Sequence, residues 1–221
     1  MTQEQINAKE EILTKIKESI LSNEDGQLII VEGEAGSGKT VLMSTLLYEL
    51  GKYNLDLDEN LDIHLLVNHN EHVSIYSQIA SKLGIANKKN KIVQKPTSFI
   101  NNNSSDEKVD VVIVDEAHLL LTQGKQSYQG KNHLDDLLAR AKVVVIVFDI
   151  KQVLTTEQIW EIDKLNEYFD KAKSNSNHVT LRNQMRINSD ISTVNWIRNL
   201  VDYQVINSIP KDKLGYDIKI F

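Results

Sequence analysis

The chain has 221 residues, no cysteine and a formal net charge of −6, from 31 acidic and 25 basic residues. This length suits one large α/β domain better than two full domains, and the lack of cysteine excludes disulfides, thiol nucleophiles and cysteine-based zinc sites. The acidic balance means that any nucleic-acid binding must rest on a local patch. The apolar runs are too short to cross a membrane and the polar N-terminus is not a signal peptide, so we expect a cytoplasmic protein with no membrane partner.

The first 84 residues are predicted to alternate between helix and strand. The predicted elements are a helix over 6–20, a strand over 28–31, a helix over 39–50, a strand over 63–67 and a helix over 71–83. Apolar residues at helical spacing indicate the helices, and Gly51 and Gly84 are expected to end the second and the third. The strands are short and β-branched.

The rest of the chain is predicted to hold two more strands and two loops. The strands cover 111–114 and 143–148, and the polar, glycine-containing loops cover 101–108 and 122–131. In all four predicted strands the apolar residues scarcely alternate with polar ones, which is typical of strands covered on both faces. We therefore predict a three-layer α/β sandwich, with a mostly parallel P-loop sheet and helices on both faces, in a single domain over residues 1–221. The last six residues read as a further strand.

A glycine-rich motif directly follows the strand over 28–31 and opens the helix that begins near Lys39. The candidate phosphate-binding residues are Gly33, Glu34, Ala35, Gly36, Ser37, Gly38, Lys39, Thr40 and Val41. Glycines let backbone N–H groups approach phosphate, and the helix start adds a positive end to the site. Lys39 is expected to reach the β- and γ-phosphates of ATP, and the Thr40 hydroxyl to bind Mg²⁺. Glu34 is expected to point outward.

Two acids follow the strand over 111–114 in the sequence Asp115-Glu116-Ala117-His118. The carboxyl ends of parallel strands meet at the edge of the sheet where ligands bind. We expect Asp115 to hold Mg²⁺, directly or through water, and Glu116 to act as the general base on the attacking water. The acid pair indicates ATP hydrolysis rather than binding alone.

Three further segments resemble motifs of superfamily one helicases. The strand over 143–148 ends in an Asp-x-x-Gln segment that resembles the third motif, which implies that Gln152 senses the γ-phosphate. Residues 181–186 resemble the fourth motif and imply that Arg186 stabilises charge in the transition state. Residues 2–5 resemble the glutamine motif, which implies adenine recognition by Gln5, with Gln3 nearly as suitable.

Across residues 2–221 the chain resembles a bacterial and phage P-loop family, domain of unknown function 2075, related to the helicase part of Schlafen proteins. The resemblance rests on VEGEAGSGKT, VNHNE, PTSFIN, VVIVDEAHLLL, FDIKQVL and LRNQMRI. It implies a RecA-like first motor domain whose second RecA-like domain is missing from this chain.

Contacts with single-stranded DNA or RNA are predicted at three places. Asn68, His69 and Asn70 follow the second strand, where related helicases touch the backbone of the nucleic acid, and Thr97, Ser98 and Phe99 resemble a second contact. Core packing is the favoured interpretation for Phe99. The marked basic cluster is Lys88, Lys89, Lys91 and Lys95, which either contacts phosphate or is a solvated face.

The function predicted from these residues is a Mg-ATP-dependent ATPase of superfamily one helicase type, which couples hydrolysis to action on nucleic acid. Two alternatives remain open: a stand-alone ATP-dependent switch that acts on proteins, and a nucleotide-binding interaction module with little turnover. A small-molecule kinase is disfavoured, because the acid pair and the Asp-x-x-Gln segment suit a water nucleophile.

Overall fold

The computed structural model describes residues 1–22, 24–57, 61–86, 91–123, 128, 130, 132–149, 152, 160–183 and 189–215. The chain divides into two compact units, residues 1–183 and residues 184–221, and each is described by itself. Among the described residues, no helix combines the length and the apolar character that crossing a membrane requires.

The first unit is built on a six-stranded sheet in which every described pair of neighbours is parallel. The strands are β1 (Gln27–Gly33), β2 (Ile63–Leu66), β3 (Val93–Gln94), β4 (Val109–Val114), β5 (Ala141–Phe148) and β6 (His178–Leu181). Their order across the sheet is β3-β2-β4-β5-β1-β6. Because the strands all run the same way, the segments that leave their carboxyl ends gather at one edge.

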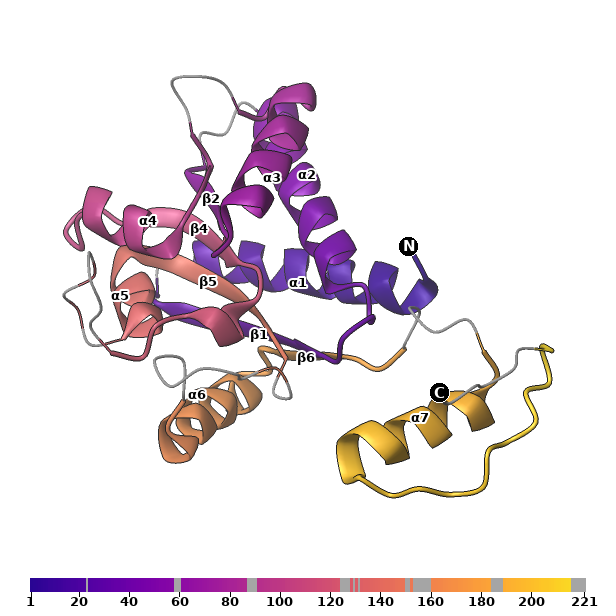
Figure 1. Ribbon diagram of the computed structural model, residues 1–221. Helices are drawn as coiled ribbons and strands as arrows, with labels where there is room; N and C mark the ends of the chain where they lie inside the picture. Colours follow the sequence, from indigo (N-terminus) through magenta and orange to yellow (C-terminus); the bar gives the residue numbers. More distant parts are fainter. Residues whose placement is uncertain are drawn as a thin grey trace. The chain divides into compact units, whose positions relative to one another are not determined.

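Helices cover both faces of this sheet, as Figure 1 shows. One face packs against α1 (Gln3–Leu21), α2 (Lys39–Leu57) and α3 (Asn70–Lys82). The other packs against α4 (Pro96–Asn102), α5 (His133–Arg140) and α6 (Ile162–Ser174). Along β1, Ile29 and Val31 join the first core while Leu28 and Ile30 join the second, so the strand is buried on both sides. The predicted three-layer α/β sandwich is confirmed.

The four strands predicted from apolar runs are all present, but two short strands escaped prediction. Both β3 and β6 lie at the edges of the sheet, with two and four residues respectively. An edge strand has only one neighbour, so pairing with the sheet supports it even where its own sequence carries little apolar character.

The prediction that Gly51 ends the second helix is wrong, because α2 continues to Leu57. A methyl group at Gly51 would overlap Ile85 Cγ2, so this glycine allows a close approach between α2 and the segment after α3. The predicted boundary at Gly84 is correct: α3 ends at Lys82, and Gly84 has a φ of +73°. Packing rather than helix termination explains the first glycine.

The predicted loops were placed less well. Asn101 and Asn102 belong to α4, and only the residues after them leave regular structure. Most of the predicted loop over 122–131 lies outside the described residues, but Tyr128 within it is buried. The strand predicted for residues 216–221 also lies outside the described residues.

The second unit contains α7 (Ile191–Tyr203). Asp190 caps this helix by accepting hydrogen bonds from the backbone N–H groups of Ser192 and Thr193 at 2.8 Å and 3.0 Å. Trp196 is buried and donates to the carbonyl oxygen of Asn207 at 2.9 Å.

Candidate functional site

The glycine-rich loop connects the end of β1 at Gly33 to the start of α2 at Lys39. Gly36 and Gly38 have φ values of 86° and 82°, which only glycine adopts at little cost. A Cβ atom on Gly33 would lie 2.6 Å from Ser37 Oγ, so the loop is too tight for a side chain there. The backbone thus makes a narrow turn directly ahead of a helix N-terminus, where anions are stabilised.

The ammonium group of Lys39 lies within this turn. It donates hydrogen bonds to the carbonyl oxygens of Gly33 at 2.6 Å and Glu34 at 2.8 Å, and to Asp149 Oδ2 at 3.1 Å. Asp149 follows β5 and is only 2% exposed, so a buried carboxylate is paired with the lysine. The structure therefore brings the end of β5 to the loop, with Lys39 between them.

Asp115 follows β4 at the same edge and is 2% exposed. Its carboxylate accepts hydrogen bonds from the Tyr76 hydroxyl at 2.9 Å and from the Glu116 backbone N–H at 3.0 Å. Burial raises the pKa of Asp115 above its ordinary value, and the nearby Glu116 charge adds to the rise, while the Tyr76 hydrogen bond opposes it. A buried, oriented carboxylate of this kind suits a divalent cation, which compensates its charge.

Glu116 differs from Asp115 in both backbone and surroundings. Its φ and ψ of 54° and 49° place it in the left-handed region, where a residue with a side chain is strained. Its side chain is 30% exposed, and Glu116 Oε2 lies 3.6 Å from His72 Nδ1 on α3. One acid is thus buried and the other open to water, a difference that matches separate metal-binding and proton-accepting roles.

Gln152 lies three residues beyond Asp149, and its backbone N–H donates to the Asp149 carbonyl oxygen at 3.1 Å. This bond keeps Gln152 close to the end of β5, the strand between β1 and β4. Arg186 lies outside the described residues. The γ-phosphate roles of both residues stay predictions.

Gln5 supports the glycine loop from α1. Its side chain is buried, its Nε2 donates to the Ser37 carbonyl oxygen at 3.2 Å, and its Oε1 accepts from the Thr2 N–H at 3.0 Å. The Thr2 hydroxyl in turn caps the helix by accepting from the Gln5 N–H, which completes a capping box. The sequence did not indicate this contact with the loop backbone, and adenine recognition by Gln5 stays a prediction.

His118, the last residue of the Asp115-Glu116-Ala117-His118 segment, is buried beside the site. Its ring packs edge-on against Phe148 with the centroids 6.3 Å apart, and Nδ1 has no hydrogen-bond partner among the described residues. Burial lowers the pKa of His118, while the charges of Glu116 and Asp149 oppose this shift and the Lys39 charge adds to it. The charges of Lys39, Glu116 and Asp149 therefore all act on the imidazole.

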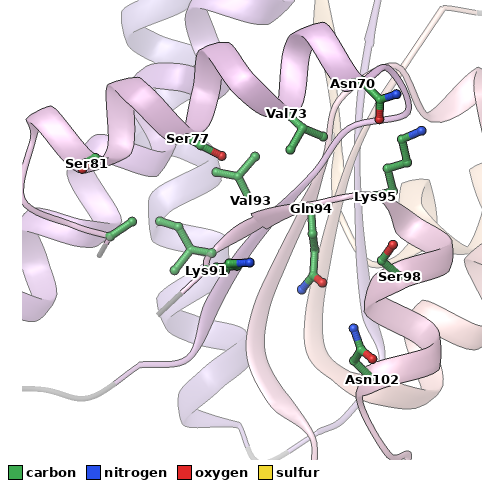
Figure 2. A pocket seen from close by; sticks show the side chains of 12 residues that line it. Asn70, Val73, Ser77, Ser81, Lys91, Val93, Gln94, Lys95, Ser98 and Asn102 are labelled. Carbon is green, nitrogen blue, oxygen red and sulfur yellow. The ribbon is translucent and has the colours of Figure 1, made fainter. Parts of the chain in front are cut away.

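A separate cleft of about 630 Å³ lies between α3, β3 and α4. Figure 2 shows its lining side chains, which are mostly polar and include Lys91, Lys95 and Asn70. Three strands stand between β3 and β1, so this cleft is distinct from the glycine loop.

The structure sorts the predicted nucleic-acid contacts into four groups. Asn70, Ser98, Lys91 and Lys95 line the cleft, whereas Lys88 and Lys89 lie outside the described residues. Phe99 has no exposed surface, which confirms the packing interpretation. Asn68, His69 and Thr97 are not among the lining residues.

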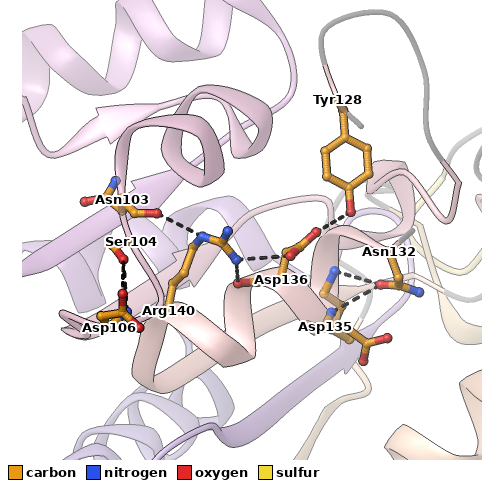
Figure 3. Close-up of polar contacts among 9 residues, drawn as sticks. Asn103, Ser104, Asp106, Tyr128, Asn132, Asp135, Asp136 and Arg140 are labelled. Atoms are coloured by element: carbon orange, nitrogen blue, oxygen red, sulfur yellow. Dashed lines mark hydrogen bonds and ion pairs between the residues drawn. The ribbon is translucent and has the colours of Figure 1, made fainter. Parts of the chain in front are cut away.

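The segment after the acid pair is tied to α4 and α5 by the polar contacts of Figure 3. Asp136 accepts from the Tyr128 hydroxyl at 2.6 Å and pairs with Arg140 at 3.0 Å, and Arg140 Nε donates to the Asn103 carbonyl oxygen at 3.0 Å. Asn132 caps α5. These contacts hold Tyr128 in place, and no sequence pattern indicated them.

His133 joins the same region from the start of α5. Its Nδ1 accepts from the Leu121 N–H at 3.1 Å, so Nε2 carries the proton and donates to Thr97 Oγ1 at 3.1 Å. Burial lowers the pKa of His133 to about 4, which keeps the ring neutral near pH 7.

The residues of the loop edge fit Mg-ATP. The glycine turn carries no side chain at Gly33, Lys39 supplies a cation, and Thr40 is exposed. Asp115 is the buried carboxylate in this set. A hydroxyl, one carboxylate, phosphate oxygens and waters are the ligands that Mg²⁺ prefers, so a cluster of several acids is not required.

Comparisons with known proteins agree with this class. Residues 26–221 match the family model "Schlafen group 3, DNA/RNA helicase domain". The uncharacterized protein YPL245W of Saccharomyces cerevisiae is 33% identical over 185 residues, which cover 77% of this chain. The chain spans 40% of that relative's length.

Two solved helicase structures are also similar. The Pif1 helicase from Candida albicans has a TM-score of 0.49 and 14% identity, covering 90% of this chain and 44% of that chain. The Hef helicase domain from Pyrococcus furiosus has a TM-score of 0.45 and 15% identity, covering 79% and 37%. At these scores the fold assignment rests on the strand order and the packed layers themselves.

Taken together, the parallel sheet, the glycine loop and the acids at one edge define a helicase-like P-loop NTPase. Because the match covers most of its length, the chain belongs to the Schlafen group 3 DNA/RNA helicase domain family.

Proposed function

We propose that this protein is a Mg-ATP-dependent ATPase of superfamily one helicase type that acts on nucleic acid. One observation carries the proposal. The glycine loop, Asp115 and Asp149 follow β1, β4 and β5, which are parallel members of one sheet, and Lys39 bonds across from the loop to Asp149. The narrower relationship to the bacterial and phage family of unknown function is part of the same proposal.

The chain's own residues divide the work of hydrolysis. The backbone of residues 33–41 and Lys39 grip the phosphates, while Thr40 and Asp115 hold the metal. Bound Mg-ATP supplies an activated γ-phosphoryl group. Glu116 takes a proton from the attacking water, which its exposure permits. Gln152 and Arg186 are proposed to sense and stabilise charge at the γ-phosphate, and Gln5 to read adenine.

The cleft between α3, β3 and α4 is proposed to bind the backbone of single-stranded DNA or RNA. Lys91 and Lys95 offer cations, and Asn70 and Ser98 offer donors, within one cleft. Translocation along a strand is proposed to need a second RecA-like domain. Domain assignment of residues 1–221 as a single motor domain is part of this proposal.

The test separates binding from hydrolysis with Glu116→Gln and Lys39→Ala. Glu116→Gln should bind a fluorescent ATP analogue within about twofold of wild type but lose turnover by about 100-fold or more, because an amide cannot accept the proton. Lys39→Ala should lose binding, because the main phosphate cation is gone. Glu49→Gln, which alters an acid that pairs with Lys9 on α1, is the matched control and should change neither.

Strand dependence is measured on the wild type by adding an oligodeoxythymidylate or an oligouridylate across a salt series. Turnover should rise with the strand, and the effect should weaken as salt increases, because phosphate contacts release counterions. Turnover without any strand response, in this chain and in a longer natural protein, favours the protein-directed switch. Normal turnover in Glu116→Gln refutes the assignment of the base.

A further inference from the structure

We propose that helix α3 couples occupancy of the cleft to the acid pair, with His72 and Tyr76 as the positioning residues. This inference rests on the proposed function, because it links the strand-binding cleft to the hydrolytic edge. Neither His72 nor Tyr76 belongs to a recognised motif of the chain. Their contacts with the acid pair arise from the packing of α3.

One stripe of α3 lines the cleft. Val73, Ser77 and Ser81 are spaced four residues apart, so they lie on the same side of the helix, and Asn70 lines the cleft at its first turn. Figure 2 shows these side chains along one helix facing β3 and α4. A ligand in the cleft therefore presses against almost the full length of α3.

The neighbouring stripe of the same helix touches both acids. His72 and Tyr76 are also four residues apart; His72 Nδ1 lies 3.6 Å from Glu116 Oε2, and the Tyr76 hydroxyl donates to Asp115 Oδ2 at 2.9 Å. Adjacent sides of one rigid element thus face the cleft and the hydrolytic acids.

Tyr76 also reaches the helix of the phosphate loop. Burial and the Asp115 charge raise the pKa of Tyr76 while nearby Ser44 on α2 lowers it, and the Ser44 hydroxyl donates to the Thr40 carbonyl oxygen at 2.8 Å. Tyr76 therefore contacts Asp115, which is proposed to hold the metal. It also lies near Ser44, whose hydroxyl is bonded to the backbone of Thr40, the other proposed metal ligand.

The geometry makes these contacts sensitive to small movements. Tyr76 is 4% exposed, so water cannot readily replace its bond to Asp115. A hydrogen bond weakens once its length exceeds about 3.2 Å, so a shift of a few tenths of an ångström in α3 alters the orientation of the carboxylate. A helix moves as a unit, because its turns are linked by backbone hydrogen bonds.

The experiment measures coupling as a ratio of binding constants, without turnover. The Kd of the full chain for a fluorescein-labelled 20-nucleotide oligodeoxythymidylate is determined by anisotropy, with and without Mg²⁺ and a non-hydrolysable ATP analogue. Coupled sites must change each other's affinity by the same factor. We expect the nucleotide to change the strand Kd of wild type by about tenfold.

Tyr76→Phe and His72→Ala should bring this ratio to within about twofold of one, while the strand Kd without nucleotide stays near the wild-type value. His72→Asn should keep most of the coupling, because the amide nitrogen of asparagine takes the place of Nδ1. Tyr168→Phe is the matched control: it removes a buried tyrosine–aspartate hydrogen bond on α6, to Asp135, and should leave the ratio unchanged.

The outcomes distinguish this inference from the function on which it rests. If wild type couples the two ligands and folded Tyr76→Phe and His72→Ala do so equally, α3 is not the coupling element and the proposed function stands. If Tyr76→Phe does not fold, His72→Ala decides, because the His72 side chain is 41% exposed. A wild type that binds no strand overturns both proposals, and one that binds both ligands with a ratio of one overturns the coupling.

Discussion

At the scale of single residues, Asp115 and Glu116 show how neighbours in sequence acquire different chemistry. Asp115 is enclosed by Tyr76 and a backbone N–H, while the left-handed backbone of Glu116 turns the next carboxylate toward a more exposed position. The burial of Asp115 also lowers the stability of the fold. A buried negative charge opposes folding until a cation compensates it.

Asp115→Asn should therefore stabilise the protein in the absence of nucleotide while abolishing Mg-dependent turnover. Burial raises the pKa of Asp115, so the folded chain holds the proton more tightly than the unfolded chain and the group destabilises the fold at neutral pH. Removing the charge should raise Tm at pH 7 by about 2–4 °C for each kcal/mol recovered. The gain should shrink as the pH falls toward the ordinary aspartate value of about 4, because wild type is then protonated as well.

Thermal melts followed by circular dichroism at pH 7 and pH 5 measure this effect. Asp110→Asn is the control with the opposite expected sign, because Asp110 is paired with Lys142 at 2.7 Å and loses that pair. A lower Tm for Asp115→Asn at pH 7 contradicts the prediction.

His133 predicts a second pH effect, with the opposite sign. Its pKa is lowered by burial to about 4, against about 6.5 in an unfolded chain. Between these values the unfolded state binds a proton that the folded state does not, so stability falls as the pH drops through this window. The total loss is on the order of 3 kcal/mol, at about 1.36 kcal/mol per pKa unit.

Urea unfolding at pH 7, 6 and 5 tests this prediction in wild type and His133→Gln, which cannot titrate. The dependence of unfolding free energy on pH should be shallower in the variant. Thr97→Val removes the hydrogen-bond partner of His133 but changes no titratable group. It should therefore lower stability by a similar amount at each pH. An equal slope in wild type and His133→Gln argues against a buried neutral ring.

At the scale of elements, the strands were the most predictable part of the fold. Four apolar runs without alternation identified β1, β2, β4 and β5, because strands covered on both faces bury every side chain. The boundary of α2 was missed, since a glycine that permits close packing looks the same in sequence as one that ends a helix. The edge strands β3 and β6 depend on their neighbours for pairing.

Gly51→Ala tests the packing explanation. Alanine normally gains about 1 kcal/mol over glycine inside a helix. Here the new methyl group would overlap Ile85, so we expect a net destabilisation of about 1–3 kcal/mol in chemical denaturation. Combining the change with Ile85→Ala should cost less than the sum of the two single variants, because the overlap is partly relieved. If Gly51→Ala stabilises the protein, the packing explanation for this glycine is wrong.

At the scale of the whole molecule, the chain divides into two units, residues 1–183 and residues 184–221. The loop, the acid pair and Gln152 belong to residues 1–183, and Arg186 belongs to residues 184–221. If Arg186 stabilises charge at the γ-phosphate, a protein without residues 184–221 should still bind ATP but should hydrolyse it more slowly.

A protein of residues 1–183 should fold and bind Mg-ATP but turn it over at least about 10-fold more slowly than the full chain. Its sheet and both cores are complete, since the core residues named for each face all lie within it. Arg186→Ala in the full chain should show a similar loss of turnover with binding retained. Circular dichroism and binding of a fluorescent ATP analogue provide the measurements, and an unfolded fragment contradicts the independence of the first unit.

The sequence by itself determined the class of fold and which candidate residues follow β1, β4 and β5. Buried parallel strands end at one edge, so residues placed directly after β1, β4 and β5 meet there, whatever the details of packing. Local sequence was therefore sufficient to group the glycine loop with the acids, and the resemblance to known motifs supplied Gln152 and Arg186.

Only the tertiary structure decided which side chains support these residues. Tyr76 and Asp115 are 39 positions apart, and Gln5 and Ser37 are 32 apart; both contacts depend on how a helix is rotated against the sheet. No local pattern encodes that rotation, because it results from the fit of a whole helix face into the core. The cleft beside α3 could not be predicted for the same reason. Its walls come from α3, β3 and α4, which only the folded chain brings together.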